Sequence, residues 1–120
     1  MPHIILEHSH HVTEWIDPQK LFDPLHHMLS ECLPTELSSC KSRCILSDHV
    51  VIGDGRIDKA FVHVTLKILA GRSDRIKQQA GEIVISHIKT YFLSQLPRMD
   101  ISFSVELTDL SPYYFKDSSL

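Results

Sequence analysis

The sequence predicts an α+β domain in which two β-α-β units form a four-stranded mixed sheet with both helices on one face. Two long amphipathic segments with helical periodicity each lie between two shorter segments with strand periodicity. The order strand–helix–strand therefore occurs twice, in pseudo-repeats at residues 2–59 and 60–120. We expect one domain over residues 1–120, built as a structural duplication.

The first unit opens with a strand at PHIILE, residues 2–7, where β-branched residues partly alternate. A polar connection, HSHHVTEW, follows it. A helix is expected from Asp17 as N-cap and Pro18 as first helical residue, and Pro24 should either kink it or delay its start. Pro34 ends this helix, whose apolar residues recur at helical spacing: Leu21, Leu25, Met28, Leu29 and Leu33.

The second strand, SCKSRCILS, should place charged and small side chains on opposite faces. Lys41 and Arg43 alternate with Cys40, Ser42 and Cys44, so both cations lie on one face. The following Gly53-Asp54-Gly55 predicts a turn, and it is no phosphate loop because no Gly-Lys-Ser/Thr follows.

The second unit begins with the clearest strand, AFVHVTLKIL, at residues 60–69. Ser73 is expected to cap a helix that Pro97 closes, and ISFSVEL supplies the last strand. The uncovered sheet face should carry Ile, Val and Phe side chains, which would imply oligomerisation. The second helix should bury one broad stripe made of Ile76, Ala80, Ile83, Val84, His87, Ile88, Tyr91 and Leu96.

Composition excludes several classes of function. The formal charge of −3 offers no basic field to a nucleic-acid backbone, so no nucleic-acid partner is expected. No stretch approaches the roughly 18 apolar residues of a membrane span. The amino terminus lacks the basic start of a secretory signal. The chain has three cysteines, an odd number, so a closed set of disulfides would leave one thiol unpaired. We expect a reduced, cytoplasmic protein.

Four stretches resemble the tautomerase superfamily and, within it, the 5-carboxymethyl-2-hydroxymuconate isomerase family. They are the opening MPHIILE, the run AFVHVTLKILAGRS, the helix core QQAGEIVISHIKTYF, and ISFSVEL with PYYFK. They span nearly the whole chain in the family's order. The resemblance implies a homotrimer of β-α-β duplications with active sites between subunits, and an enzyme of aromatic-acid catabolism that needs neither metal nor organic cofactor.

The resemblance also implies the site residues. Pro2 would become the first residue after removal of Met1, and its secondary amine would act as the catalytic base. Arg72, Arg43 and Lys41 would hold the carboxylates of an unsaturated 2-hydroxy acid. The isomerases typically have Arg-Ser-Arg where this chain has Lys41-Ser42-Arg43, and lysine is not equivalent to arginine for planar carboxylates. The resemblance therefore implies the class of substrate, an unsaturated 2-hydroxy polycarboxylate.

Other interpretations remain open at the sequence level. Pro2 alone is also typical of a strand opener, and an enol such as phenylpyruvate is an alternative substrate. A non-catalytic trimeric binding protein of the same fold is a further alternative. Histidines at 8, 10 and 11 suggest zinc, but they have no partner at a recognisable metal spacing, so we expect a surface loop and no metal. His3 points away from Pro2 and is expected to be structural.

Overall fold

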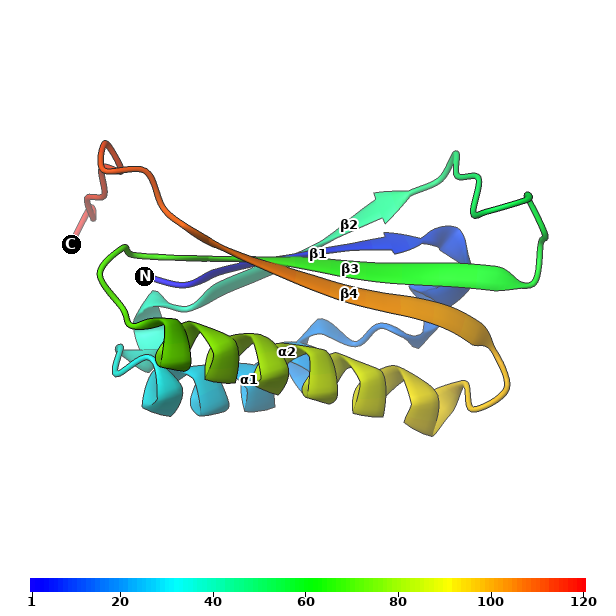
Figure 1. Cartoon of the computed structure of the whole chain (residues 1–120), viewed down its shortest axis with the longest axis horizontal. Helices are drawn as coiled ribbons and strands as arrows, with labels where there is room; N and C mark the ends of the chain where they lie inside the picture. The colour runs from blue at the N-terminus through cyan, green and yellow to red at the C-terminus, as the bar shows by residue number, and fades with distance from the viewer.

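Two layers make up the molecule, a four-stranded sheet and a pair of helices packed on one of its faces (Figure 1). The computed structural model describes all of residues 1–120. The strands are β1 (His3–Ser9), β2 (Lys41–Ser47), β3 (Lys59–Ile68) and β4 (Asp100–Asp109). The helices are α1 (Pro18–Cys32) and α2 (Asp74–Gln95), with short 3-10 turns η1 (His10–Trp15) and η2 (Leu37–Ser39).

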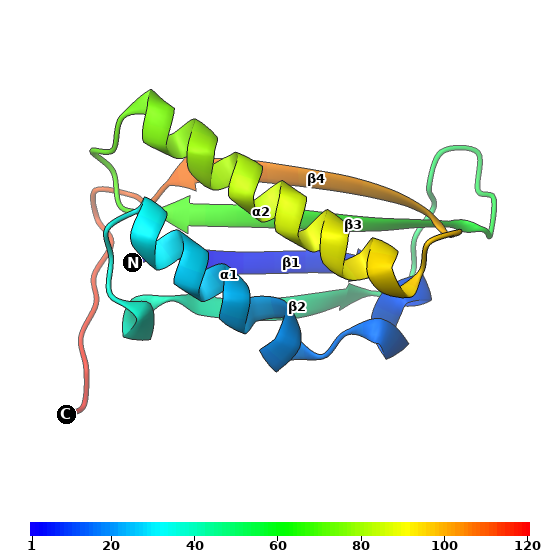
Figure 2. The same ribbon diagram turned by 90° about the horizontal axis from the view of Figure 1, so that it is seen from below.

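The sheet has the order β2-β1-β3-β4 and is mixed, as predicted. The outer pairs β1–β2 and β3–β4 are parallel, whereas the central pair β1–β3 is antiparallel. Each parallel pair is joined by its helix, which is the connection that parallel neighbours require. Both helices cross the same face of the sheet (Figure 2).

Local sequence explains where the helices begin. The Asp17 side chain accepts a hydrogen bond from the Lys20 amide, and the Ser73 hydroxyl accepts one from the Ile76 amide. The first helix starts at Pro18, as predicted, and continues through Pro24, so Pro24 does not delay its start. It ends two residues before Pro34.

The core lies between the sheet and the helices, and strand alternation directs side chains into it. Every second residue of β1 and β3 is buried, beginning at Ile4 and Ala60. Met28 was expected on the buried side of α1, but it is 37% exposed. The helices contribute four buried residues each, Leu21, Phe22, Leu25 and Leu29 from α1 and Ala80, Val84, Ile88 and Phe92 from α2.

The open face of the sheet is mostly polar, so the expected apolar face is only partly found: Ile5, Ile45 and Phe61 lie on it, but no valine does. The apolar residues of β4, among them Phe103 and Val105, pack against the core instead. The open face follows from the register, because directly paired residues project to the same side. Its rows are Lys41–His3–Lys67–Thr108, Arg43–Ile5–Thr65–Glu106 and Ile45–Glu7–His63–Ser104.

None of the helices is both long enough and apolar enough to cross a bilayer.

Candidate active site at the start of the chain

One edge of the sheet collects most of the residues that the sequence nominated. Strands β1 and β2 begin at this edge, while β3 and β4 end there, because the register pairs His3 with both Lys41 and Lys67. The loop from β3 to α2 and the segment after β4 also lie at this edge (Figure 2). Segments far apart in the sequence therefore meet around the amino terminus.

Pro2 lies just before β1 and is buried. Its carbonyl accepts a hydrogen bond from the Lys41 amide at 3.1 Å, which fixes the chain start against β2. Alternation places Pro2 on the side of Ile4 and Leu6, facing the helices. Pro2 is therefore sheltered from solvent, and cations lie near the amino terminus that precedes it.

The pKa of the amino-terminal group reflects the charges that surround this edge of the sheet. Burial lowers the pKa of the Met1 amino group, and the nearby charges of Arg72, Lys116 and Lys41 lower it further, whereas Cys40 opposes them. An amine at this edge therefore loses its proton more readily than one in water.

Arg72 bridges the end of one helix and the start of the other. Its Nε and Nη2 donate to the Leu33 carbonyl at 3.3 and 2.9 Å, and its Nη1 donates to the Leu69 carbonyl at 3.0 Å. Leu33 is the C-cap of α1, where a cation also interacts favourably with the helix dipole. The guanidinium is thus held by backbone groups alone, at the helix-facing side of the edge.

Lys41 and Arg43 lie on the open face, as their spacing predicted. The Lys41 ammonium lies 3.4 Å from the Met1 sulfur. Arg43 is one register step further along β2, and its Nη1 donates to the His3 Nδ1 at 2.9 Å. The structure therefore brings Arg72 and Lys41 close to the amino terminus. Arg43 lies further along β2 and is connected to the chain start by its hydrogen bond to His3.

None of these three cations forms an ion pair with a carboxylate; the ion pairs of the structure lie elsewhere, at His27–Asp23, Arg56–Asp58 and Lys77–Asp109. Two further cations were missed by sequence reasoning. Lys67 pairs in register with His3, and Lys116 comes from the segment after β4. The alternation of β3 was a signal for Lys67, because it places Lys67 on the polar face, whereas nothing local indicated Lys116. Positive charge without internal partners favours an anionic ligand.

The other histidines lie apart from this edge. His8 and Ser9 end β1 and are buried, so the expected surface loop is wrong there. His10 and His11 stack on each other in η1. The His26 Nε2 lies 2.6 Å from the Ser42 hydroxyl, so this side chain joins α1 to β2.

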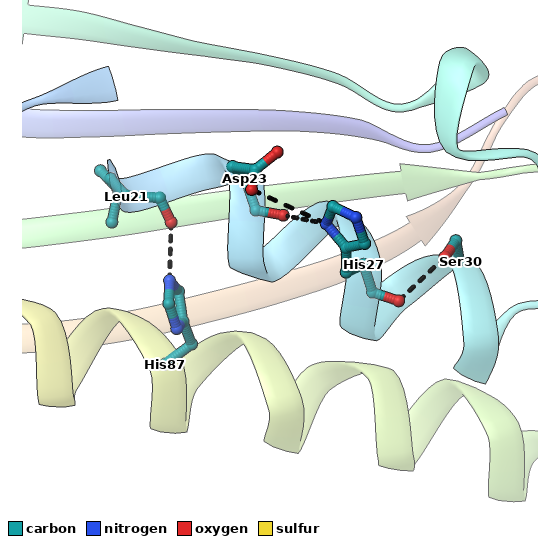
Figure 3. A network of polar contacts seen from close by, with 5 residues as sticks. All are labelled: Leu21, Asp23, His27, Ser30 and His87. Atoms are coloured by element: carbon teal, nitrogen blue, oxygen red, sulfur yellow. Dashed lines mark hydrogen bonds and ion pairs between the residues drawn. The ribbon is translucent and has the colours of Figure 1, made fainter. Parts of the chain in front are cut away.

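Two more histidines lie on the helices, and only His87 joins one helix to the other (Figure 3). The His87 Nε2 donates to the Leu21 carbonyl at 2.6 Å and so ties α2 to α1. His27 is exposed, and its Nδ1 donates to the Asp23 carbonyl at 2.9 Å. A surface hollow of about 880 Å³ lies beside His87 between the two helices and includes none of the candidate residues. Because cations and the sheltered chain start are absent there, the chain-start edge is the better candidate site.

The three cysteines are all free thiols, and burial raises the pKa of each. Cys44 lies on the helix-facing side of β2, opposite the two cations, and Cys40 is buried just before this strand. A raised pKa opposes thiolate formation, so none of them resembles an activated nucleophile.

Comparisons with known proteins agree on the family and the fold. The family model described as "CHMI: 5-carboxymethyl-2-hydroxymuconate isomerase" matches residues 2–120. A 5-carboxymethyl-2-hydroxymuconate Delta-isomerase from Escherichia coli is 38% identical over 112 residues, which are 93% of this chain and 89% of that protein. A solved 5-carboxymethyl-2-hydroxymuconate isomerase from Deinococcus radiodurans R1 superposes with a TM-score of 0.76 at 22% identity, covering 98% of this chain and 90% of that one.

A more distant structure shares the fold alone. It is described as a fused 4-OT wild-type symmetric trimer, and it superposes with a TM-score of 0.64 at 14% identity. The alignment covers 89% of this chain and 85% of that one. The tautomerase-like architecture predicted from the sequence is confirmed.

Proposed function

The chain belongs to the 5-carboxymethyl-2-hydroxymuconate isomerase family, and from this premise we propose that it converts a dienol to its keto tautomer. The substrate is 5-carboxymethyl-2-hydroxymuconate or a similar unsaturated 2-hydroxy polycarboxylate from aromatic-acid catabolism. The observation that carries this proposal is the set of cations without carboxylate partners around a buried Pro2. No cofactor enters the reaction as proposed.

Pro2 is the proposed base. A prolyl nitrogen within a peptide bond is an amide with no useful basicity, so the proposal requires removal of Met1. The freed amine would lie one residue further in than the Met1 amino group, about 3.8 Å along the chain. Burial and the charges of Arg72 and Lys41, which lower the pKa of the Met1 amine, would act on it as well. A base tuned toward working pH is what general acid–base catalysis needs.

The reaction moves one proton. The neutral Pro2 amine accepts it from the 2-hydroxyl of the dienol, so the O–H bond breaks and a dienolate forms. The protonated amine then donates a proton to a carbon of the conjugated chain, where a C–H bond forms. The oxygen electron pair becomes the C=O bond, and the carbon–carbon double bonds shift accordingly. The product is the ketone, and the amine is regenerated as a neutral base.

The cations bind substrate and stabilise the intermediate. Arg72 stands at the helix-facing side of Pro2, next to the N-terminus of α2, whose dipole adds attraction for a carboxylate. Lys41 and Arg43 stand on the open face. Fixed positive charge in a partly dry site favours the dienolate more than the neutral dienol.

The proposed assembly is a homotrimer that works in the cytoplasm. The fused 4-OT structure with the same fold is described as a symmetric trimer, which supports a trimer here. Free thiols suit a reducing compartment.

The decisive experiment compares Pro2→Ala with the parent protein on a panel of 2-hydroxydienoates, followed by ultraviolet absorbance. Intact mass spectrometry first establishes that Met1 is absent. We expect kcat to fall about 10²-fold or more in Pro2→Ala. The matched control is Pro97→Ala, at an exposed proline after α2, which should keep the parent rate.

Four results would contradict the proposal. Equal rates for Pro2→Ala and the parent would remove Pro2 as base. A fully active protein that retains Met1 would do the same. Turnover of phenylpyruvate enol in place of every polycarboxylate would transfer the activity to a different substrate, and no turnover at all would favour a binding protein.

A further inference from the structure

The segment that follows β4, residues 110–120, crosses the chain-start edge. The Leu110 amide donates to the Ile68 carbonyl at 2.6 Å, which keeps the segment beside the end of β3. It then runs past the amino terminus and beyond β2 (Figure 2). Tyr113 and Phe115 are 80% and 87% exposed, whereas Tyr114 between them is partly buried. One side chain of three is therefore turned toward the domain.

Tyr114 is turned toward His3. Its hydroxyl lies 2.8 Å from the His3 Nε2, and the two rings pack edge to face with centroids 5.8 Å apart. The other ring nitrogen of His3 lies 2.9 Å from the Arg43 Nη1. Tyr114, His3 and Arg43 thus form a continuous chain of two hydrogen bonds, here called the relay, from the C-terminal segment to a candidate substrate-binding cation.

The donors in this relay are fixed by chemistry. A guanidinium has only donors, so the His3 Nδ1 must accept from Arg43 and carries no proton. The proton of the neutral ring then sits on Nε2, which donates to the Tyr114 oxygen. The relay exists only while His3 is neutral.

The surroundings of His3 keep it neutral. Burial lowers its pKa, and the charges of Arg43, Lys41, the amino terminus and Lys67 lower it further. No carboxylate is among the groups that act on it.

We propose that Tyr114 and His3 are positioning residues that orient the Arg43 guanidinium toward a substrate carboxylate remote from the reacting hydroxyl. With Nη1 committed to His3, the guanidinium keeps its other N–H groups for a ligand. Arg43 lies two residues beyond Lys41 on β2, a step of about 6.6 Å, so it reaches a more distant carboxylate than Lys41 does. This inference rests on the proposed function and adds a selectivity determinant to it.

The kinetic test is Tyr114→Phe, which keeps the ring and removes the hydroxyl. We expect KM for the polycarboxylate substrate to rise roughly fivefold with kcat nearly unchanged, as for the loss of one hydrogen bond. KM for a monocarboxylate enol should not change. Tyr113→Phe is the matched control, because Tyr113 is exposed and its hydroxyl has no partner. Equal KM values for the two variants would overturn the inference.

Two variants of His3 separate positioning from packing. His3→Leu removes the acceptor for Arg43 and should raise KM at least as much as Tyr114→Phe. His3→Asn restores an acceptor near the position of Nδ1 and should recover part of the loss. If leucine and asparagine behave alike, His3 has only a packing role and the relay is refuted.

A measurement without turnover distinguishes failure of the relay from failure of the proposed function. Nitrogen-15 spectra of the parent protein should show His3 neutral, with its proton on Nε2 and none on Nδ1. A proton on Nδ1 would overturn the relay whatever the activity. The expected tautomer in a protein that turns over none of the substrates would refute the proposed function and leave the relay standing.

Discussion

Replacing Arg72 by lysine tests whether this residue holds the fold, the substrate, or both. The substitution keeps the positive charge and removes the planar fork, so the three contacts to the Leu33 and Leu69 carbonyls cannot all survive. The Leu33 carbonyl, which closes α1, loses two donors at once. A lysine ammonium can replace one of them at most in the same geometry.

The magnitude follows from those contacts. A hydrogen bond from a charged donor contributes about 1.5–3 kcal/mol when it is buried. Arg72 is only partly buried, so water can satisfy some of the released carbonyl capacity. We expect the free energy of unfolding to fall by about 1–3 kcal/mol, which urea denaturation followed by circular dichroism measures at a fixed protomer concentration.

The same variant should lose activity. Losing a preorganised donor to a developing oxyanion typically reduces kcat about 10²-fold, and we expect that order here. Arg75→Lys is the control, since Arg75 is exposed in the first turn of α2. A stability loss with unchanged kcat/KM would make Arg72 a structural residue alone, and parent values for both quantities would refute the reasoning entirely.

Two further predictions concern titratable groups near β2. Burial lowers the pKa of His26 from its ordinary value of 6.5. As the pH falls, His26 therefore takes up its proton in the unfolded chain before it does so in the folded protein. The free energy of unfolding is accordingly highest above pH 6.5 and declines as the pH falls through that value toward the folded pKa. His26→Gln, which can still reach the Ser42 hydroxyl, should make this decline in urea-unfolding free energy shallower, and an unchanged slope would be inconsistent with the assignment. Burial raises the pKa of the Cys44 thiol from 9.0 to about 11, so its thiolate fraction at pH 8 drops about 100-fold. Iodoacetamide should alkylate Cys44 about 100-fold more slowly in the native protein than in urea, as peptide mass spectrometry measures, and equal rates would show that the thiol is accessible and ionised.

Local sequence signals determined most of the fold. The Asp17-Pro18 and Ser73 starts, the alternation of β3 and the stripe on α2 each reflect a rule that acts over a few residues. The order of the strands, β2-β1-β3-β4, was not predicted and is known from the structure. The polarity of the open face was misjudged, because the apolar residues of β4 were not assigned to the helix-covered side.

The candidate site was only partly visible in the sequence. Alternation alone placed Lys41 and Arg43 together. The contacts of His3 were beyond reach, because they join residues separated by 40 and 111 positions. His8 was assigned to a surface loop, but it ends β1 and is buried, because tertiary packing overrides the usual exposure of a polar side chain.

The two outermost strands of the sheet each have one edge whose backbone groups pair with no neighbouring strand, and these two strands differ from each other. One border is formed by β2 and the other by β4, which are unlike in length and sequence. A contact between β2 of one molecule and β4 of the next is heterologous, because it joins two different surfaces. Repetition of this contact gives a ring if the rotation between neighbours closes, and an open fibre if it does not. Where copies of the chain join in this way, open-ended stacking is avoided only when the rotation between successive molecules closes a ring.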